Sequence, residues 1–342
     1  MSAAPTKKKI KLALQGGGSH GAYAWGVVDA LLEDGRVEIE AVVGTSAGAM
    51  NAAMTGCGLI TGGPEAARDL LRRFWKKSSD EGKKSPIQAT PLDKMLSRGN
   101  IEFSPLWATF DAMSRIFSPY ELNPMNLNPL QKIIADVVDF PALRAGGDIC
   151  KVFIAATNVL TGRLRVFEQA ELSPETIMAS ACLPFLFQAA EINGEFFWDG
   201  GYSGNPPIFP LIYAGGTNDI LVVQINPINI TEVPRTARGI MDRINTLSFN
   251  SSLMREMRAI QFVSDLLDGN ELDAAKYKRV NIHTIDAEAE LAQFGVSSKL
   301  NSDWDFLTYL HDMGRQKAQE FLAEHFDKIG VESSTDVRAK FF

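Results

Sequence analysis

The sequence predicts an α/β protein with a parallel central sheet that is covered by helices. Within the first sixty residues, a short apolar strand, a glycine turn and a helix occur twice in succession. This order is typical of parallel sheets, in which a helix connects neighbouring strands. The chain has 342 residues, of which 45% are apolar, so it is long enough to bury a large core.

The hydrophobic pattern places each expected element. The first strand, at residues 9–15, ends at three glycines, and the second strand, at 39–43, ends at the turn 44–48. A helix follows each turn, and the second helix is expected at 47–56. Further along the chain we expect helices at 64–79, 174–181 and 236–267, strands at 152–156, 163–167, 220–225 and 280–285, and a final amphipathic helix through 306–325.

Two regions stand apart from the regular core. Residues 76–129 contain six prolines and several large apolar side chains, which are Phe103, Leu106, Trp107, Phe110, Ile116 and Phe117. We interpret this stretch as an insertion beside the site, acting either as a lid or interfacial element or as a peripheral packed loop. The expected organisation is a catalytic domain at residues 9–226 and a mainly helical C-terminal region at 227–342, which serves as a cap, an oligomer surface or a membrane platform.

Composition limits the classes of partner. The net charge of −7 argues against nucleic acid and against unaided binding to an anionic membrane, although an apolar patch would still allow contact with lipid. The three cysteines fit neither a disulfide framework nor a zinc site. No apolar window approaches 18 residues, and no signal-peptide core follows the N-terminal lysines. We therefore expect no transmembrane segment and a cytoplasmic location, peripheral at a membrane if lipid is the substrate; homo-oligomerisation stays open.

The turn 44–48 is a candidate nucleophile turn. Gly44-Thr45-Ser46-Ala47-Gly48 is a G-x-S-x-G motif between an apolar strand and a helix. A nucleophilic serine must stand on a tight, strained turn, and glycines remove the Cβ atoms that would clash there. The N-terminus of the following helix favours a developing negative charge. The alternative is an ordinary strand–helix turn with an N-capping serine.

The first glycine turn allows two interpretations. Residues 16–21 fit G-x-G-x-x-G, the dinucleotide fingerprint, but that site needs an acid at the end of the second strand. Glu38 and Glu40 lie at the start of that strand instead. In an acyl-transfer enzyme, the backbone N–H groups of Gly16, Gly17 and Gly18 would face Ser46 and form an oxyanion hole.

A nucleophilic serine needs a base, and two kinds of residue are eligible. His283, His311 and His325 follow Ser46 in the order seen in α/β-hydrolases, but each fits a structural role in a strand or helix. Asp199 leaves an aromatic strand and enters the turn Gly200-Gly201, as a positioned catalytic carboxylate would. The alternative for Asp199 is a common Asp-Gly hairpin turn.

Together, the glycine turn 16–21, the motif 44–48 and Asp199-Gly200-Gly201 closely resemble the patatin-like phospholipases. The stretch Ala179-Ser180-x-x-x-Pro184 adds to the resemblance, which covers about residues 9–225. The resemblance implies a three-layer α/β/α sandwich with a mainly parallel central sheet. It also implies a serine lipid acyl hydrolase with Ser46 as nucleophile, Asp199 as general base and the glycine run as oxyanion hole, without a metal or other cofactor.

The resemblance also implies substrates and leaves alternatives open. Family substrates are phospholipids, galactolipids and neutral acylglycerols, presented as a membrane or as micelles. Acyl transfer to another lipid and a catalytically silent lipid-binding or signalling protein remain alternatives. Many relatives carry Arg or Lys where this chain has His20, a neighbour of the expected oxyanion site, so the positive charge found there is missing or present only at lower pH.

Overall fold

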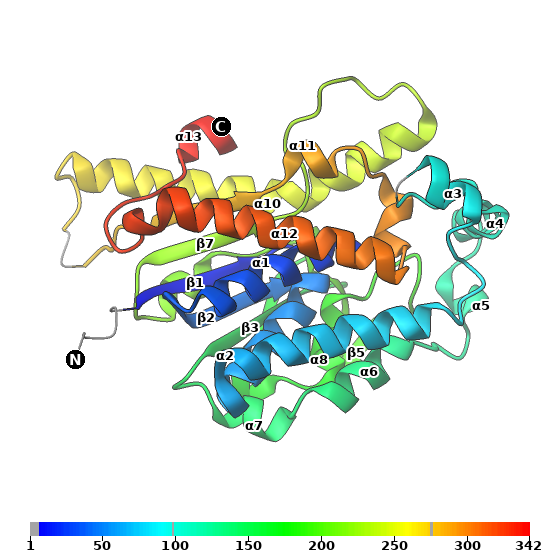
Figure 1. Ribbon diagram of the computed structural model, residues 1–342, viewed down its shortest axis with the longest axis horizontal. Coiled ribbons are helices and arrows are strands. Elements are labelled where there is room, and N and C mark those ends of the chain that lie inside the picture. The colour runs from blue at the N-terminus through cyan, green and yellow to red at the C-terminus, as the bar shows by residue number, and fades with distance from the viewer. Residues whose placement is uncertain (1–6, 98, 274–275) are drawn as a thin grey trace.

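The central feature of the fold is a mixed sheet of eight strands (Figure 1). The computed structural model describes residues 7–97, 99–273 and 276–342. The sheet order is β5-β6-β3-β2-β1-β7-β8, and β4 also pairs with β3. The strands are β1 (Lys8–Leu14), β2 (Val37–Thr45), β3 (Lys151–Asn158), β4 (Leu164–Phe167), β5 (Ala190–Ile192), β6 (Glu195–Asp199), β7 (Asp219–Gln224) and β8 (Asn281–Asp286).

Five neighbouring strands, from β3 to β8, run parallel, and β4, β5 and β6 are antiparallel additions at one side. Because β1 and β2 are parallel, their carboxyl ends meet at one edge of the sheet. The glycine turn after β1 and the motif after β2 therefore lie next to each other. This is the edge that the sequence predicts for the site.

Helices cover both faces of the sheet, as Figure 1 shows. Residues of β1 alternate between two buried clusters, with Leu12 and Leu14 in one and Ala13 in the other. The larger cluster packs under α1 (Gly21–Asp34), α2 (Ala47–Gly82), α6 (Pro129–Val137), α7 (Phe140–Ala145), α8 (Pro174–Ser180) and α12 (Trp304–His325). The smaller cluster packs under α9 (Phe209–Tyr213), α10 (Ala237–Asp268) and α13 (Val337–Phe341). The predicted three-layer α/β/α class is confirmed.

Two helices follow Ser46, as the sequence predicts, and together they make up the element α2 (Ala47–Gly82). Gly63 separates them with a non-helical φ of 78° and ψ of −161°. Pro64 begins the second helix, because a proline is tolerated in the first turn. The expected break between 47–56 and 64–79 is therefore confirmed, although the first helix continues beyond residue 56. Residues 76–82, expected to be irregular, are the last two turns of the second helix.

The region 227–342 is part of the same packed structure. Strand β8 pairs with β7 along its whole length, and α12 lies against α1. The two helices approach closely, since a Cβ on Gly26 would lie 1.9 Å from the carbonyl oxygen of His311. Elements of this region therefore complete the central sheet, and its role as a cap, an oligomer surface or a membrane platform stays a prediction.

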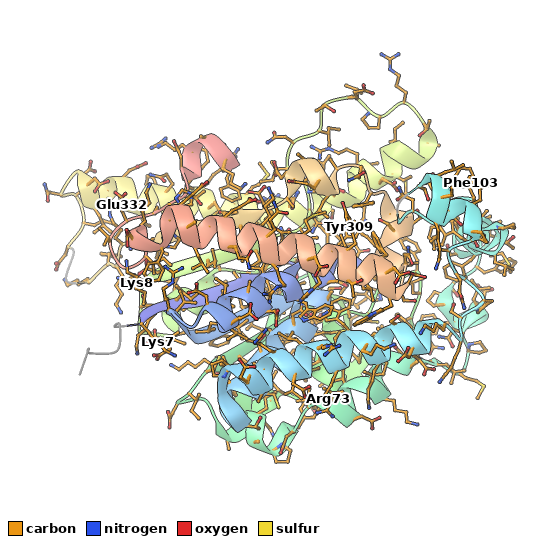
Figure 2. The ribbon with its side chains drawn as sticks, in the orientation of Figure 1. Lys7, Lys8, Arg73, Phe103, Tyr309 and Glu332 are labelled. Atoms are coloured by element: carbon orange, nitrogen blue, oxygen red, sulfur yellow. The ribbon has the colours of Figure 1, made fainter. Side chains whose placement is uncertain are left out.

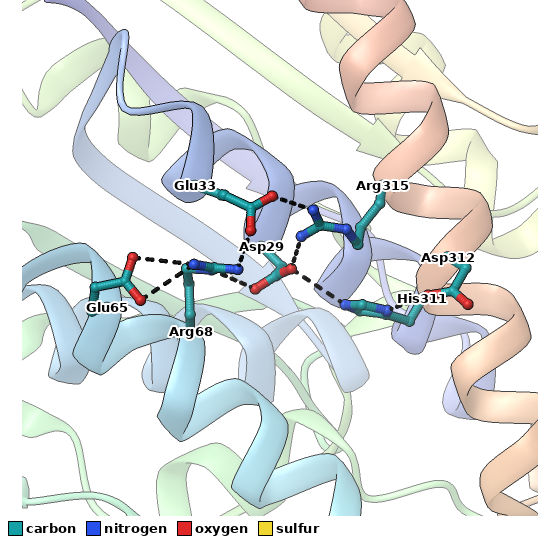
Figure 3. A network of polar contacts seen from close by, with 7 residues as sticks. All are labelled: Asp29, Glu33, Glu65, Arg68, His311, Asp312 and Arg315. Carbon is teal, nitrogen blue, oxygen red and sulfur yellow. Dashed lines mark hydrogen bonds and ion pairs between the residues drawn. The ribbon is translucent and has the colours of Figure 1, made fainter.

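A polar network joins α1, α2 and α12 on the outer side of this packing (Figure 3). Asp29 accepts a hydrogen bond of 2.8 Å from Arg68 Nε, and it also pairs with Arg315 and with His311. Burial disfavours the charged form of Asp29, but the hydrogen bonds from His311 and Arg68 and the charges of Arg68 and Arg315 hold its pKa below the ordinary value. The network therefore links α12 to α1 and α2, in the N-terminal part of the chain.

The insertion is mostly helical. It contains α3 (Pro91–Leu96), α4 (Pro105–Ser114) and α5 (Pro119–Leu122), and Figure 1 shows these helices gathered at one end of the molecule. Trp107 is 4% exposed and packs inward, whereas Phe103 is 49% exposed at the margin of the molecule (Figure 2). Among the described residues, no helix is both long enough and apolar enough to span a membrane.

Candidate active site

Ser46 occupies a strained turn between β2 and α2. Its φ of 56° and ψ of −123° lie in a region that side chains rarely adopt. The flanking glycines are required by close packing, because a Cβ on Gly44 would lie 2.1 Å from the carbonyl oxygen of Gly48. A Cβ on Gly48 would in turn lie 2.1 Å from the carbonyl oxygen of Leu14. The turn therefore fixes the serine at the end of two strands and at the N-terminus of a long helix.

The glycine turn after β1 lies directly against this serine. A Cβ on Gly16 would be 2.6 Å from the Cβ of Ser46, so only glycine fits there. Ser46 itself is 6% exposed, and its backbone N–H donates a 2.8 Å hydrogen bond to the Oγ of Ser180. The structure thus brings together the two motifs that the sequence places thirty residues apart.

The three glycines of the first turn have different hydrogen bonds. The N–H of Gly16 donates to Oδ1 of Asn205 at 2.7 Å, and its carbonyl oxygen accepts from Nδ2 of Asn226 at 2.8 Å. In the described part of the chain, the N–H groups of Gly17 and Gly18 donate to no acceptor. Of the three N–H groups that the sequence predicts as oxyanion donors, that of Gly16 already has an acceptor; the oxyanion hole itself stays a prediction.

Asp199 ends β6 and is completely buried. Its Oδ1 accepts a 2.8 Å hydrogen bond from the N–H of Gly201, and its own N–H donates to the carbonyl oxygen of Cys182 at 2.8 Å. The Ser46 hydroxyl lies near enough to the Asp199 carboxyl group to lower its pKa, but no hydrogen bond of ordinary geometry joins the two side chains. Oδ2 of Asp199 has no partner among the described residues.

Burial dominates the electrostatics of this carboxyl group. It raises the pKa of Asp199 to about 6, although the Ser46 hydroxyl, the Gly201 N–H and the charge of Lys299 each lower it. Burial therefore makes this carboxylate a better proton acceptor than an exposed aspartate, because it disfavours the charged form. Such perturbed groups gather at functional sites.

His283, His311 and His325 each make contacts with residues other than Ser46 and Asp199. His283 bonds to Asp219 and Ser334, and His311 belongs to the network around Asp29. His325 packs against Phe321 at the end of α12. These are structural positions.

His20 follows the glycine turn but points into the protein. Its Nε2 lies 2.8 Å from the Oγ of Ser298, and the rings of Phe294 and Phe306 pack edge-on against it. Burial, together with the positive charge of Lys299, lowers the pKa of His20 to about 3. Its imidazole is therefore neutral across the physiological range.

The residues that a dinucleotide or a metal would use are engaged or scattered. Glu40 lies in the first half of β2, where it binds Nζ of Lys9 at 2.7 Å and the N–H of Thr217. Across the described ranges, no three His, Cys, Asp or Glu side chains gather as metal ligands would.

Three residues around the site have roles that motif reasoning did not assign. Ser180 holds the backbone of Ser46, Asn205 holds Gly16, and Lys299 places its charge near Asp199. The first two belong to short stretches, ending at Pro184 and beginning at Asn205-Pro206, whose patterns stand out in the sequence. Lys299 has no sequence signal, because only the tertiary fold brings residue 299 to residue 18.

Comparison with known proteins shows the family to which the chain belongs. The family model described as patatin-like phospholipase matches residues 12–212, more than half of the chain. No curated protein sequence matches the chain. Among solved structures, VipD from Legionella pneumophila is 15% identical, with a TM-score of 0.44 over 94% of this chain and 68% of that chain. ExoU, solved with SpcU from the type III secretion system of Pseudomonas aeruginosa, is 16% identical, with a TM-score of 0.39 over 96% of this chain and 53% of that chain. The chain thus spans about half the length of ExoU.

Proposed function

Because the chain belongs to the patatin-like phospholipase family, we propose that it is a serine hydrolase that cleaves acyl ester bonds of phospholipids or related lipids through Ser46 and Asp199. The observation that carries the proposal is the free oxygen of a fully buried carboxyl group beside a serine on a strained turn. The dyad needs no histidine and no metal.

In the proposed first step, Oγ of Ser46 attacks the ester carbonyl carbon while its proton passes to Oδ2 of Asp199. Even with a pKa near 6, Asp199 is far too weak a base to ionise a serine in advance, so proton transfer accompanies attack. Collapse of the tetrahedral intermediate breaks the ester C–O bond, and the leaving alcohol takes the proton from Asp199. An acyl-enzyme remains on Ser46.

Hydrolysis of the acyl-enzyme repeats the sequence with water. A water molecule gives its proton to Asp199 and attacks the acyl carbon, and Ser46 recovers the proton as the fatty acid leaves. The negative charge on the carbonyl oxygen develops in both halves of the reaction. We assign its stabilisation to the unengaged N–H groups of Gly17 and Gly18 and to the N-terminus of α2.

The insertion would bring this site to a lipid surface. Its helices and the segments between them carry large apolar side chains that are exposed to solvent. These are Leu92, Met95, Leu96, Phe103, Leu106, Met113, Ile116, Phe117, Tyr120, Leu122, Met125 and Leu127. A patch of this kind on one end of a protein with a net charge of −7 favours contact through apolar burial rather than through charge. We therefore propose an interfacial role for residues 76–129.

A fluorophosphonate probe tests the nucleophile directly. The wild-type protein should be labelled at Ser46 and should release fatty acid and lysophospholipid in equal amounts from phospholipid micelles. Ser46→Ala should lose both labelling and hydrolysis while its circular dichroism stays unchanged. Transfer of the acyl chain to an added alcohol in place of fatty acid release would indicate a transferase, and labelling with no turnover on any lipid would contradict the hydrolase.

Flotation with neutral liposomes tests the interfacial element. Changing Phe103, Leu106, Ile116 and Phe117 to Ser should reduce bound protein severalfold, since exposed apolar area drives partitioning. The matched control changes Leu160 and Val331 to Ser, because these side chains are 78% and 74% exposed outside the insertion. Equal binding by the two variants would remove the interfacial role. Trp107 is left intact because it is buried.

A further inference from the structure

Buried amide side chains hold the backbone of the glycine turn. Asn226, just after β7, donates from Nδ2 to the carbonyl oxygen of Gly16 at 2.8 Å. Oε1 of Gln15 accepts the N–H of Asn226 at 2.9 Å, and Nε2 of Gln15 donates to Oδ1 of Asn250, in α10, at 3.3 Å. The three amide residues are at most 3% exposed. The turn against Ser46 is therefore held in part by residues beyond position 212, where the match to the family model ends.

Lys299, in the short 3₁₀ helix η4 (Val296–Leu300), adds a positive charge to this group. Its Nζ donates to Oδ1 of Asn226 at 2.9 Å and lies 5.9 Å from the centre of the Phe249 ring. Its carbonyl oxygen packs on the turn, since a Cβ on Gly18 would lie 2.3 Å away. In the described part of the chain, no carboxylate forms an ion pair with this ammonium group. The charge is thus fixed against the turn without a direct counter-ion.

The same lysine also affects the proposed base. The Phe249 ring packs on the loop after Asp199, since a Cβ on Gly201 would lie 2.3 Å from its Cε1. The N–H of Gly201 in turn donates to Oδ1 of Asp199 at 2.8 Å. The charge of Lys299 lowers the pKa of Asp199, against the larger effect of burial. Lys299 is therefore linked to both parts of the proposed site.

Negative charge moves between these two parts in the proposed reaction. As Ser46 attacks and its proton passes to Asp199, the charge leaves the carboxylate and appears on the carbonyl oxygen of the ester. Lys299 contacts the glycine turn directly, whereas it reaches the loop of Asp199 through the Phe249 ring. A cation that lies nearer to the carbonyl oxygen than to the carboxylate stabilises the transition state more than the ground state, which lowers the barrier.

We propose that Lys299 is a positioning residue, which holds the glycine turn through Asn226 and supplies, through that turn, positive charge to the oxyanion. This inference rests on the proposed function, because the N–H groups of Gly17 and Gly18 are assigned there to the carbonyl oxygen. It makes a segment of the region 227–342 a component of the active site, in addition to the place of this region in the sheet.

Neutral and charged replacements of Lys299 test the role of the charge. The substrate is p-nitrophenyl butyrate, a soluble ester, so that binding to a lipid surface does not enter the rate. Lys299→Met, and Lys299→Gln, which keeps an N–H donor for Asn226, should lower kcat about 30-fold and change KM by less than about twofold. Lys299→Arg should restore at least about a third of the wild-type kcat. Lys328→Met, at a lysine whose side chain is 41% exposed after α12, should change neither constant.

Two results of these measurements would overturn the proposal. One is full activity of the neutral variants. The other is an arginine variant that is as slow as the methionine variant, because the shape of the lysine rather than its charge would then matter. Circular dichroism checks that each variant folds, and the glutamine variant decides the question if the methionine variant does not fold.

The pH profile separates the charge of Lys299 from its packing. Loss of the charge alone should raise the midpoint of the acid limb above the wild-type value near 6, because the charge lowers the pKa of Asp199. Loosened packing would instead admit water to Asp199 and lower the midpoint toward about 4. Other titratable groups that face this pair are the same in every variant, and these are His20, Cys182, Tyr202 and Asp242. The first three stay neutral between pH 5 and pH 8, with pKa values of about 3, about 11 and about 12. A downward shift in the neutral variants would reject the proposal in favour of a structural role.

Failure of this proposal is distinguishable from failure of the proposed function. If the wild-type protein hydrolyses the ester and a fluorophosphonate labels Ser46, but the neutral variants of Lys299 are equally active, only the role of Lys299 is lost. If the wild-type protein neither hydrolyses the ester nor is labelled, the proposed function fails, and the role of Lys299 fails with it.

Discussion

Asp29 and Asp199 are both buried aspartates, but the protein treats them in opposite ways. Asp29, between α1 and α12, contacts two arginines and a histidine, and its pKa lies below the ordinary value (Figure 3). Asp199, at the end of β6, accepts one backbone N–H on one oxygen, its other oxygen has no partner among the described residues, and its pKa rises to about 6. The carboxylate of Asp29 is therefore paired on both oxygens, whereas that of Asp199 is paired on one.

The difference teaches how stability and function separate within one fold. Breaking a buried ion pair destabilises a protein because a charge is left unpaired. A buried carboxylate without an ion-pair partner already destabilises the folded protein. Its removal should therefore lower catalytic activity and raise the free energy of unfolding. The two residues should therefore respond to the same substitution with effects of opposite sign on the free energy of unfolding.

The largest expected effect is on activity. Asp199→Asn removes the proposed base and keeps the shape of the side chain, so kcat for lipid hydrolysis should fall about 1000-fold. Initial rates of fatty acid release measure it. The matched change, Asp29→Asn, should leave kcat within about twofold. A comparable loss in both variants would mean that Asp199 acts through the fold.

The next effect is on stability. Asp29→Asn should lower the free energy of unfolding by about 2 kcal/mol, because Arg68 and Arg315 lose the more buried of the two carboxylates they share and keep only Glu33. Urea denaturation at pH 7 measures the change. Asp312, which touches the same network through His311 but has a side chain that is 77% exposed, is the control. Asp312→Asn should change stability by less than about 0.5 kcal/mol, and a similar loss there would remove the distinction.

A smaller effect separates the two residues by pH. The raised pKa of Asp199 means that the folded state binds its proton more tightly than the unfolded state, so stability falls as pH rises from about 4 to 6. Asp199→Asn should thus stabilise the protein by about 2 kcal/mol at pH 8 and by almost nothing at pH 4. For Asp29, whose pKa is lowered, stability is lost as pH falls, so the effect of Asp29→Asn should shrink in acid. Parallel pH curves for the two variants would contradict the assignment.

The smallest effect is a shift in the pH profile of hydrolysis. Activity on diacylglycerol should rise with pH around a midpoint near 6, because Asp199 must be ionised to act as a base. A rise in activity centred near pH 4 would show that burial does not raise the pKa of Asp199.

Much of this structure follows from local sequence. The turns at 16–18 and 44–48 predict a parallel sheet edge because glycine is needed where backbones approach closely, and the strand order agrees. Asp199 was identified by its position after an aromatic strand. The α/β class and the family are confirmed, while the proposed roles of Ser46 and Asp199 remain predictions.

Other features depend on contacts between distant residues. Nothing in the local pattern places Lys299 against Gly18 or Asn205 against Gly16, because these pairs are joined only by the tertiary fold. The break at Gly63-Pro64 within α2 follows from local sequence, whereas the extension of its second helix to Gly82 does not. The same limit applies to the inward position of His20, which is set by Ser298 and Phe294.

The order of strands has a consequence for the biosynthesis of this protein. Strand β1 lies between β2 and β7, so it has both neighbours only after β7 has been synthesised. The glycine turn that follows β1 is packed still later, because its contact comes from residue 299. During translation, Ser46 leaves the ribosome some 250 residues before Lys299 does. A nascent chain therefore carries Ser46 before Lys299 can pack against the glycine turn, so the surroundings of the proposed nucleophile are incomplete until residue 299 has emerged.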